Sequence, residues 1–475
     1  MAGIKFGTDG WRAIIAEDFT FANVRRVAQG IAAYIKISGL AKRGVVIGYD
    51  NRFLSEEFAR AGAEILLGNG IPTWLFKKPT PTPLTAFAIR HLQSAGAIMI
   101  TASHNPPEYN GIKFIPEYAG PALTDVTDVI EAEVEKVVDG GRIYTLDLAE
   151  GAKLELFKEI DLDKEYVSHL LNLVHTDVIK KRALKVVVNP MYGAGLNYLD
   201  KILLELGCEV KALNNYRDTL FGGTMPEPTD HLLSDLKRSV DAFQADIGLA
   251  LDGDADRFGI IDREGKYISP NQFGALLLNY LIDYRPQRGP VCRSVATTHL
   301  LDRIAREAGI GILETPVGFK YIGQGLREHN ALLGIEESGG LSIMGHVPEK
   351  DGLLACLLAV EMLSAREKTF AELQDELDAT YGKVFSKRYD IRCSETVKKQ
   401  ALQALADYQP QHIAGLGVAD VTNLDGKQFL LNDGSWALVR VSGTEPLFRI
   451  YVETASPDQL QEIKKEVAKA IGLDE

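Results

Sequence analysis

Two hydrophobic patterns alternate along most of the chain. Short apolar runs, such as residues 45–50, are typical of buried strands. Between such runs, apolar residues recur every three or four positions, as Val24, Val27 and Ile31 do, which is typical of amphipathic helices. Strands that alternate with helices in this way predict βαβ units around parallel sheets.

The pattern changes after about residue 384, where strand-like runs follow one another without a helix between them. These runs are residues 388–392, 428–431, 436–440 and 448–453. A terminal helix is expected to begin after Ser456 as its N-cap, with Pro457 at its first position. This part of the chain therefore predicts a smaller α+β domain.

A chain of 475 residues is longer than one hydrophobic core normally supports, so we expect several domains. The patterns predict an α/β protein with three mixed α/β domains of related topology and a C-terminal α+β domain. The expected boundaries are 1–151, 152–268, 269–383 and 384–475.

Composition narrows the class of function. The net charge of −13 argues against a nucleic-acid partner, which normally selects a basic face. The 4 cysteines have no paired spacing, which indicates reduced thiols and no cysteine-based metal site. The first residues lack a signal-peptide pattern, and no apolar run approaches the roughly 20 residues that span a bilayer. We expect a soluble, cytoplasmic protein that acts on a small molecule.

Residues 101–107, Thr-Ala-Ser-His-Asn-Pro-Pro, follow an apolar run that predicts a buried strand. The two prolines lack backbone donors and cannot extend a strand ladder. The hydroxyl of Ser103 is therefore expected on a stiff loop at a strand end, beside the imidazole of His104. Such loops are where α/β proteins place their chemistry. For these residues alone, a turn that only caps the next segment is an equally good interpretation.

Residues 252–257, Asp-Gly-Asp-Ala-Asp-Arg, also follow an apolar run. In an extended chain Asp252, Asp254 and Asp256 would share a face. Three converging carboxylates repel one another unless a cation lies between them, and oxygen ligands favour Mg²⁺ or Ca²⁺. An EF-hand loop would need glutamate at its twelfth position, where this chain has Arg263. A solvated acidic turn is the remaining alternative.

Two further loops give weaker signals. Residues 334–340 follow an apolar run and contain Glu336 and Ser338, which suit sugar hydroxyls, although an ordinary turn is the alternative. Residues 6–12 form a glycine-containing turn that ends in Arg12 and, taken alone, could be any surface turn.

A third weaker signal lies between two strands of the last domain, at residues 440–446. Arg440 offers a fork that matches phosphate oxygens, and Ser442 and Thr444 add hydroxyl donors. The loop is thus a candidate anion site. A hairpin with an incidental arginine is the other interpretation.

Together, and in this order, these segments resemble the α-D-phosphohexomutase family, which includes phosphoglucomutases and phosphomannomutases. The resemblance covers essentially the whole chain, rests on four separate loops and is closest to bacterial-type phosphoglucomutases. It implies three mixed α/β domains and a fourth α+β domain around a central cleft.

The resemblance also implies catalytic roles. Ser103 would carry a phosphoryl group, and a phosphoserine oxygen would join the three aspartates in binding Mg²⁺. Arg257 would stabilise the transferred group, with Arg12 and Lys113 nearby. Lys113 and His104 are the candidates for general acid and base.

The same resemblance implies a substrate site built from the later loops. Glu336 and Ser338 would bind sugar hydroxyls, and the Arg440 loop would bind the phosphate that does not react. The full set of implied substrate residues is Glu336, Ser338, Lys350, Lys320, Arg440, Ser442, Gly443, Thr444 and Arg449.

The implied reaction has two halves. Phosphoserine would give its phosphoryl group to a hexose phosphate, and the resulting 1,6-bisphosphate would reorient and return its other phosphoryl group to Ser103. The net change interconverts hexose 1-phosphate and hexose 6-phosphate. Glucose 1,6-bisphosphate would be the priming activator, and the enzyme would be a monomer or homodimer.

Two departures from the family pattern bear on the sugar. Bacterial bifunctional mannomutases commonly have histidine after the Ser-Gly of the sugar loop, where this chain has Gly340. Residues 349–352 and 315–320 look more like phosphoglucomutases, in which a lysine such as Lys350 helps bind substrate. We therefore expect glucose phosphate. Lys350 and Lys320 could equally be solvated surface lysines.

Several functional alternatives stay open. Within the family they are a phosphomannomutase, a bifunctional mannose and glucose mutase, and a phosphoglucosamine mutase. From other classes they are a non-catalytic sugar-phosphate sensor and a phosphatase that uses a serine phosphoenzyme.

Overall fold

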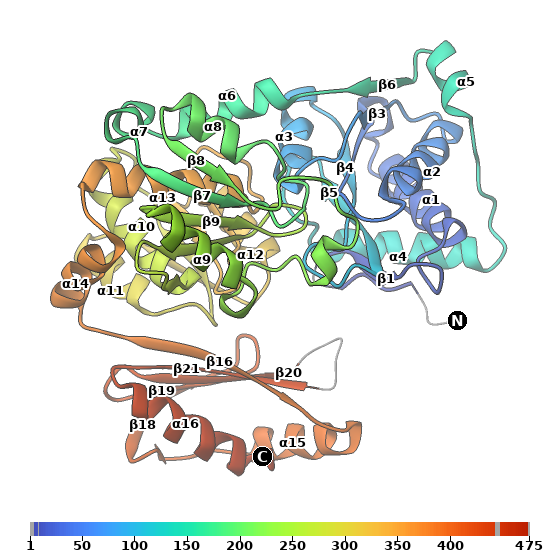
Figure 1. The fold of residues 1–475 in the computed structure, drawn as a ribbon. Helices are drawn as coiled ribbons and strands as arrows, with labels where there is room; N and C mark the ends of the chain where they lie inside the picture. The colour runs from blue at the N-terminus through green and yellow to red at the C-terminus, as the bar shows by residue number, and fades with distance from the viewer. Residues whose placement is uncertain (1–3, 8, 442–446, 474–475) are drawn as a thin grey trace. The chain divides into compact units, whose positions relative to one another are not determined.

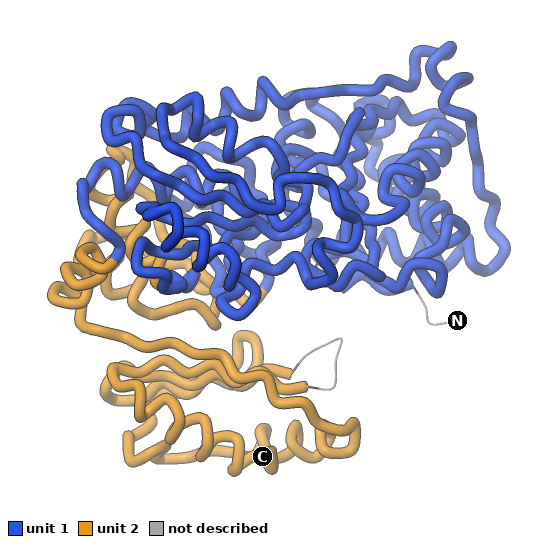
Figure 2. The backbone as a smooth tube through the Cα atoms, viewed as in Figure 1, with its two compact units in different colours: residues 1–270, 318–370 blue, residues 271–317, 371–475 orange. Residues whose placement is uncertain are grey.

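The computed structural model describes residues 4–7, 9–441 and 447–473 (Figure 1). The chain divides into two compact units, Met1–Pro270 with Gly318–Phe370, and Asn271–Val317 with Ala371–Glu475 (Figure 2). This division runs through the third expected domain. The expected boundaries at 151, 268 and 383 stay a prediction.

The first unit contains a mixed sheet in the order β1-β5-β4-β2-β3-β6. Its strands are β1 (Trp11–Ile14), β2 (Val45–Tyr49), β3 (Thr73–Phe76), β4 (Gly96–Ile100), β5 (Tyr109–Pro116) and β6 (Phe157–Ile160). The pairs among β2, β3, β4 and β6 are parallel, as predicted, whereas β5 pairs antiparallel with both β1 and β4. Strands β4 and β5 are antiparallel because the chain reverses in the loop between Ile100 and Tyr109.

Helices alternate with these strands along the chain (Figure 1). They are α1 (Phe21–Ile37), α2 (Ser55–Gly68), α3 (Thr82–Leu92), α4 (Thr124–Val138), α5 (Leu148–Lys153), α6 (Asp163–Leu173) and α7 (Thr176–Arg182). The predicted apolar stripe of α1, including Val24, Val27 and Ile31, is buried in the core with residues of β2 and α2. Its burial confirms the helical period.

A second sheet of the first unit has the order β11-β10-β9-β7-β8. Its elements are β7 (Lys185–Asn189), α8 (Leu199–Glu205), β8 (Glu209–Ala212), α9 (Ser234–Phe243), β9 (Ile247–Leu251), β10 (Phe258–Asp262) and β11 (Tyr267–Ile268). Strand β9 pairs in parallel with β7 and antiparallel with β10. The aspartate loop lies between β9 and β10.

The first unit also holds a later stretch of chain. Its elements are α12 (Phe319–Glu328), β14 (Leu333–Ile335), β15 (Leu341–Ile343) and α13 (Gly352–Arg366). Strands β14 and β15 pair antiparallel around the expected sugar loop, and α13 packs on β9 and β10. Three candidate loops thus share one design, in which a buried strand ends and its chain returns as an antiparallel neighbour.

The second unit begins with α/β elements and ends in an antiparallel sheet of order β16-β21-β20-β19-β18-β17. The first group is α10 (Pro270–Tyr284), β12 (Val291–Ser294), α11 (Leu300–Glu307), β13 (Ile312–Thr315) and α14 (Phe370–Tyr381). The second group is β16 (Phe385–Arg392), α15 (Glu395–Asp407), β17 (His412–Ile413), β18 (Leu416–Thr422), β19 (Lys427–Leu431), β20 (Trp436–Val441), β21 (Leu447–Thr454) and α16 (Pro457–Ala470). Strands β17 to β21 follow one another as predicted, but helix α15 lies between β16 and β17, where no helix was expected.

Helix α16 begins as predicted, with Ser456 at the N-cap and Pro457 at the first position. The Ser456 side chain makes no capping hydrogen bond, and its backbone N–H instead donates to Thr454 Oγ1 at 3.0 Å. Among the described residues, no helix has both the length and the apolar character needed to cross a membrane.

Candidate active site

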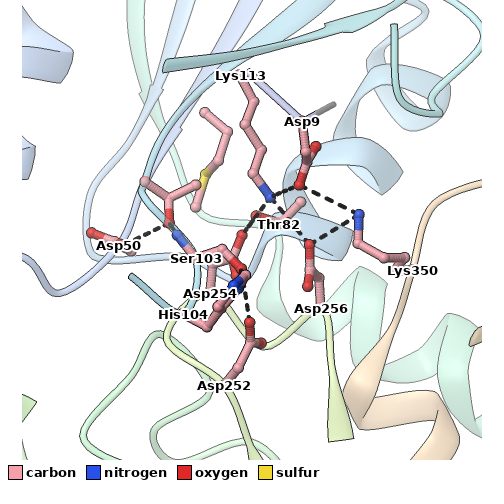
Figure 3. A network of polar contacts seen from close by, with 12 residues as sticks. Asp9, Asp50, Thr82, Ser103, His104, Lys113, Asp252, Asp254, Asp256 and Lys350 are labelled. Atoms are coloured by element: carbon pink, nitrogen blue, oxygen red, sulfur yellow. Dashed lines mark hydrogen bonds and ion pairs between the residues drawn. The ribbon is translucent and has the colours of Figure 1, made fainter. Parts of the chain in front are cut away.

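Ser103 lies just after β4 and its side chain is fully buried. The Oγ donates to Asp252 Oδ2 at 2.9 Å and lies 3.2 Å from His104 Nδ1 (Figure 3). Its backbone is left-handed, with φ 51°. That conformation costs a non-glycine residue on the order of 1–3 kcal/mol and persists only where neighbours fix it. The hydroxyl is therefore held toward the aspartate loop, which an ordinary capping turn would not require.

The three aspartates converge as predicted. Asp252, Asp254 and Asp256 are each 0% exposed, and one ligand oxygen from each lies within 4.8 Å of the others. This burial excludes a solvated acidic turn. Within the described chain, Asp254 Oδ1 and Asp256 Oδ1 are buried oxygens with no hydrogen-bond partner. Orphaned carboxylate oxygens at this spacing fit a hard divalent cation.

Lys113 on β5 neutralises part of this acidic cluster. Its Nζ lies 2.8 Å from Asp9 Oδ2, 2.9 Å from Asp254 Oδ2 and 3.1 Å from Asp256 Oδ2 (Figure 3). Burial alone would lower the pKa of Lys113, but the three carboxylates outweigh burial and raise it. The same contact overcomes burial at Asp254 and holds the pKa of that carboxyl below its usual value. Lys113 is thus a fixed ammonium.

In the part of the chain that the structure describes, no cationic partner lowers the pKa of Asp252 as strongly as Lys113 lowers that of Asp254. Burial, followed by repulsion from Asp254 and Asp256, raises the pKa of Asp252 well above its ordinary value. Its Oδ1 accepts the backbone N–H of Arg257 at 3.0 Å, and its Oδ2 faces Ser103. A cation bound between the aspartates would favour the ionised form.

Lys350 is the second ammonium of the cluster, and it is buried rather than a solvated surface lysine. Its Nζ lies 3.2 Å from Asp256 Oδ2, 3.3 Å from Glu349 Oε1 and 3.6 Å from Asp9 Oδ2. Burial would raise the pKa of Asp9, yet Lys113, Lys350 and then Arg12 together hold it well below its usual value. Carboxylates and cations therefore alternate through the site.

Arg12 and His104 flank the serine. Arg12 Nη1 donates to Asn105 Oδ1 at 2.7 Å, and its Nη2 lies 3.4 Å from Asp9 Oδ2. Burial, and then the charges of Arg257 and Arg12, lower the pKa of His104 well below its usual value. His104 is therefore a neutral imidazole at pH 7, next to the Ser103 hydroxyl.

The expected sugar loop lies beside the aspartate loop, because the backbone of Arg257 pairs with that of Gly340. Glu336 is buried, and its Oε1 accepts the N–H of Gly318 at 2.7 Å. Burial, and then the charge of Glu337, raise the pKa of Glu336 to about 7. Ser338 is half-buried on the same loop.

Two residues predicted to bind phosphate lie in the second unit. Arg440 and Arg449 are directly opposite each other on β20 and β21. Like charges at opposed positions repel, so this pair suits an anion. Asp425 Oδ2 lies 2.8 Å from Arg440 Nη2. The other predicted members of this loop, Ser442, Gly443 and Thr444, lie outside the described residues.

Comparisons with known proteins agree with this geometry. Four family models, described as phosphoglucomutase/phosphomannomutase α/β/α domains I, II and III and C-terminal domain, match residues 3–139, 164–265, 269–381 and 391–470. The chain belongs to the α-D-phosphohexomutase family. The predicted fold class and the phosphohexomutase activity are thereby confirmed.

Individual relatives of this phosphohexomutase differ in their named sugar. The "Phosphoglucomutase/phosphomannomutase" of Thermococcus kodakarensis is 34% identical over 97% of this chain and 96% of its own. The "Probable phosphoglucosamine mutase" of Pyrococcus horikoshii is 31% identical over 99% and 98%. A crystal structure from Thermus thermophilus has a TM-score of 0.85 at 33% identity, with 99% of both chains covered. The relatives therefore leave the substrate of this phosphohexomutase open.

The structure adds residues to the phosphohexomutase site that the sequence did not single out. Asp9 bridges the two ammonium groups, and Thr82 Oγ1 donates to Asp254 Oδ2 at 2.6 Å. Asp9 had a weak signal, since it lies in the glycine-containing turn before Arg12, whereas Thr82 had none. Lys320 does not join these contacts, because its Nζ bonds to Thr124 Oγ1 at 2.9 Å. The substrate role expected for Lys320 stays a prediction.

Proposed function

We propose that this phosphohexomutase interconverts glucose 1-phosphate and glucose 6-phosphate through a phosphoserine at residue 103. One observation carries the proposal: the buried Ser103 Oγ lies 2.9 Å from Asp252 Oδ2, at the edge of three converging aspartates. A phosphoryl group on Ser103 would meet both cation-binding oxygens and fixed ammonium groups there.

The chain's own residues would supply most of the charge stabilisation. Lys113 and Lys350 are held as ammonium ions by buried carboxylates. Arg257 Nε lies 3.9 Å from Asp256 Oδ1, and Arg12 Nη2 lies 3.4 Å from Asp9 Oδ2. Asp252, Asp254 and Asp256, with an oxygen of phosphoserine, would hold Mg²⁺, which would neutralise charge on the transferring group. Preorganised cations act strongly in a site from which water is excluded.

The two candidates for proton transfer are Lys113, which lies among the aspartates, and His104, which lies beside the Ser103 hydroxyl. Lys113 is a candidate acid from the family resemblance, but the carboxylates around it raise its pKa and oppose release of its proton, so its main role would be that of a fixed positive charge beside the transferring group. His104 is neutral and 3.2 Å from the Ser103 hydroxyl, so it suits the acceptor when that hydroxyl attacks. Glucose 1,6-bisphosphate would load Ser103 before the first turnover.

Glu336 and Ser338 would bind sugar hydroxyls, while Arg440 and Arg449, with Ser442, Gly443 and Thr444, would bind the phosphate that does not react. This division suits a mutase better than a phosphatase, which has no need to retain a second phosphate.

The preference for glucose rests on the space around Gly340. A Cβ at this position would lie 2.7 Å from Lys350 Cδ and 3.0 Å from Phe319 Cδ2. The stem of Lys350 therefore fills the volume that a side chain such as histidine would take. This packing supports the glucomutase-like interpretation of the sugar loop.

The test combines mass spectrometry of Ser103 with turnover of three substrates. The protein, primed with glucose 1,6-bisphosphate in Mg²⁺, should convert glucose 1-phosphate with a higher kcat/KM than mannose 1-phosphate or glucosamine 1-phosphate. A higher value for either alternative would overturn the sugar assignment. A folded, Ser103-phosphorylated protein that converts none of them would overturn the mutase proposal.

A further inference from the structure

A buried ion pair lies directly after β2, and the proposed reaction does not use it. Asp50 and Arg52 are each 0% exposed, and Arg52 Nε lies 3.2 Å from Asp50 Oδ2. Removing a pair of charges from water costs roughly several kcal/mol per ion. Only good geometry and further hydrogen bonds offset that cost. The partners of this pair therefore indicate what it does.

The partners of Arg52 are backbone carbonyls of the serine loop. Its Nη2 donates to the carbonyl oxygens of Ser103 at 2.7 Å and Asn105 at 2.6 Å. Its Nη1 donates to those of Pro106 at 2.7 Å and Tyr109 at 3.0 Å. Only the planar fork of arginine can reach so many acceptors at once, because lysine offers a single nitrogen.

Asp50 fixes the backbone N–H of Ser103 through the side chain of Thr101. Thr101 Oγ1 donates to Asp50 Oδ2 at 2.6 Å, and the N–H of Ser103 donates to Thr101 Oγ1 at 2.8 Å (Figure 3). The backbone N–H of Ser103 is thus tied to Asp50 through Thr101, and its carbonyl is tied directly to Arg52. Both peptide groups around the serine depend on one ion pair.

The carbonyl of Ser103 is also confined by close packing against the aspartate loop. A Cβ on Gly253 would lie 2.4 Å from that oxygen, so the oxygen packs against the backbone of the aspartate loop. With its carbonyl and N–H both fixed, Ser103 keeps its left-handed φ of 51° and its Oγ stays next to Asp252.

We propose that Asp50 and Arg52 are positioning residues, which hold the backbone of Ser103 so that its Oγ faces the aspartates in line for phosphoryl transfer. The inference rests on the proposed role of Ser103 as phosphoryl carrier. Phosphoryl transfer depends mainly on positioning and electrostatics, and a misplacement of about 1 Å can cost roughly a hundredfold in rate.

The sharpest test replaces Thr101, because valine has nearly the same shape as threonine but no hydroxyl. T101V should lower kcat about tenfold while KM changes less than about twofold, since the serine moves but the substrate contacts remain. T101S keeps the hydroxyl and should restore kcat. Equal losses in T101V and T101S, or none in T101V, would overturn the proposal.

The second test replaces Arg52 by lysine and uses a matched buried arginine as control. Arg293 is also buried and bonds to Asp302 at 2.6 Å, but it lies in the second unit. R52K should lower kcat by roughly a hundredfold, and it should slow the loading of dephosphorylated Ser103 by glucose 1,6-bisphosphate in parallel. R293K should lower the Tm with little change in kcat.

The readouts separate positioning from a general loss of stability. If R52K lowered the Tm as R293K does but kept the wild-type kcat and loading rate, the pair would be a structural brace and the proposal would be wrong. Wild-type protein that never carries phosphate on Ser103 would instead overturn the proposed function itself. Intact-protein mass spectrometry of the wild type distinguishes these two failures.

Discussion

The serine and aspartate cluster of the first unit and the arginine pair of the second unit handle charge in opposite ways. In the first, Lys113 and Lys350 each contact two or more carboxylates, so charges of both signs are matched within the chain. In the second, Arg440 and Arg449 face each other across two strands, with Asp425 on Arg440. In the first region each ammonium contacts two or more carboxylates, whereas in the second Arg440 contacts Asp425 and Arg449 lies opposite Asp390 on β16.

This difference follows from what each region would do. A site that transfers a phosphoryl group must hold its charges in place before the substrate arrives, because preorganised groups need no rearrangement during the reaction. A site that binds the phosphate of the substrate gains from leaving its cations partly unmatched, since the ligand then supplies the missing anion. We expect substitutions in the first region to affect mainly kcat and those in the second to affect mainly KM.

Removal of the Ser103 hydroxyl should have the largest effect. S103A should lower kcat by at least about 10⁴-fold, because loss of the nucleophile removes the phosphoenzyme route altogether. The measurement is turnover of glucose 1-phosphate together with phosphate incorporation. S364A is the matched control, since Ser364 is also buried but lies on α13. Substantial turnover by S103A would mean that another group carries the phosphate.

Loss of one aspartate charge should have the next largest effect. Asp254→Asn removes a carboxylate that both Lys113 and a bound cation would use, so we expect kcat to fall about 10²- to 10³-fold. The Mg²⁺ concentration for half-maximal activity should rise as well. Asp262→Asn is the control, because this buried carboxylate accepts the backbone N–H groups of Glu264 and Lys266 in the turn after β10. Unchanged Mg²⁺ dependence in the Asp254 variant would contradict the metal assignment.

The arginine pair should show the opposite kinetic pattern. R440A should raise KM for glucose 1-phosphate about ten- to a hundredfold and change kcat less, since a hydrogen bond to a charged group contributes roughly 1.5–3 kcal/mol. R303A removes another arginine of the second unit, whose Nη1 donates to the Tyr381 carbonyl at 3.1 Å, and should leave KM unchanged. If R440A affected kcat alone, the division between the two regions would be wrong.

The sequence predicted the parts of both regions that depend on local patterns. The loops at Ser103 and at Asp252 could be found because each follows a run of buried apolar residues, and the helical period of α1 is visible in its apolar stripe. The aspartates were expected to converge because residues two apart share a face of an extended chain, but they converge instead through a turn in which Ala255 has φ 59° and its N–H donates to the Asp252 carbonyl. These features need no knowledge of distant contacts.

The remaining site residues could not be predicted, because distant pairings bring them in. Asp9 reaches Lys113 only because β1 pairs antiparallel with β5, in a register that sets Trp11 opposite Ile112. In the sequence, Lys350 and Lys320 could each be a substrate-binding lysine or a solvated surface lysine. Lys350 is in the site because it lies two residues before α13, which packs on β9 and β10 next to the aspartate loop.

The pH dependence of sugar binding should give the smallest effect and the finest test of the comparison. Burial and the charge of Glu337 raise the pKa of Glu336 to about 7, against the opposing influence of Lys350, the Gly318 N–H and Arg257. Below pH 7 this carboxyl is protonated and is a weaker acceptor for sugar hydroxyls. The kcat/KM of the wild type should therefore rise with pH through about 7.

E336Q isolates this contribution from the ionisation of the substrate phosphate, which affects both proteins equally. The ratio of wild-type to E336Q kcat/KM should increase about tenfold between pH 6 and pH 8, as the ionised fraction of a single carboxyl with that pKa does. Adding R440A to both the wild type and E336Q should leave this ratio unchanged, because Arg440 would bind the phosphate and not the sugar. A flat ratio across this range would remove Glu336 from the sugar site and leave the carboxyl a structural partner of Gly318.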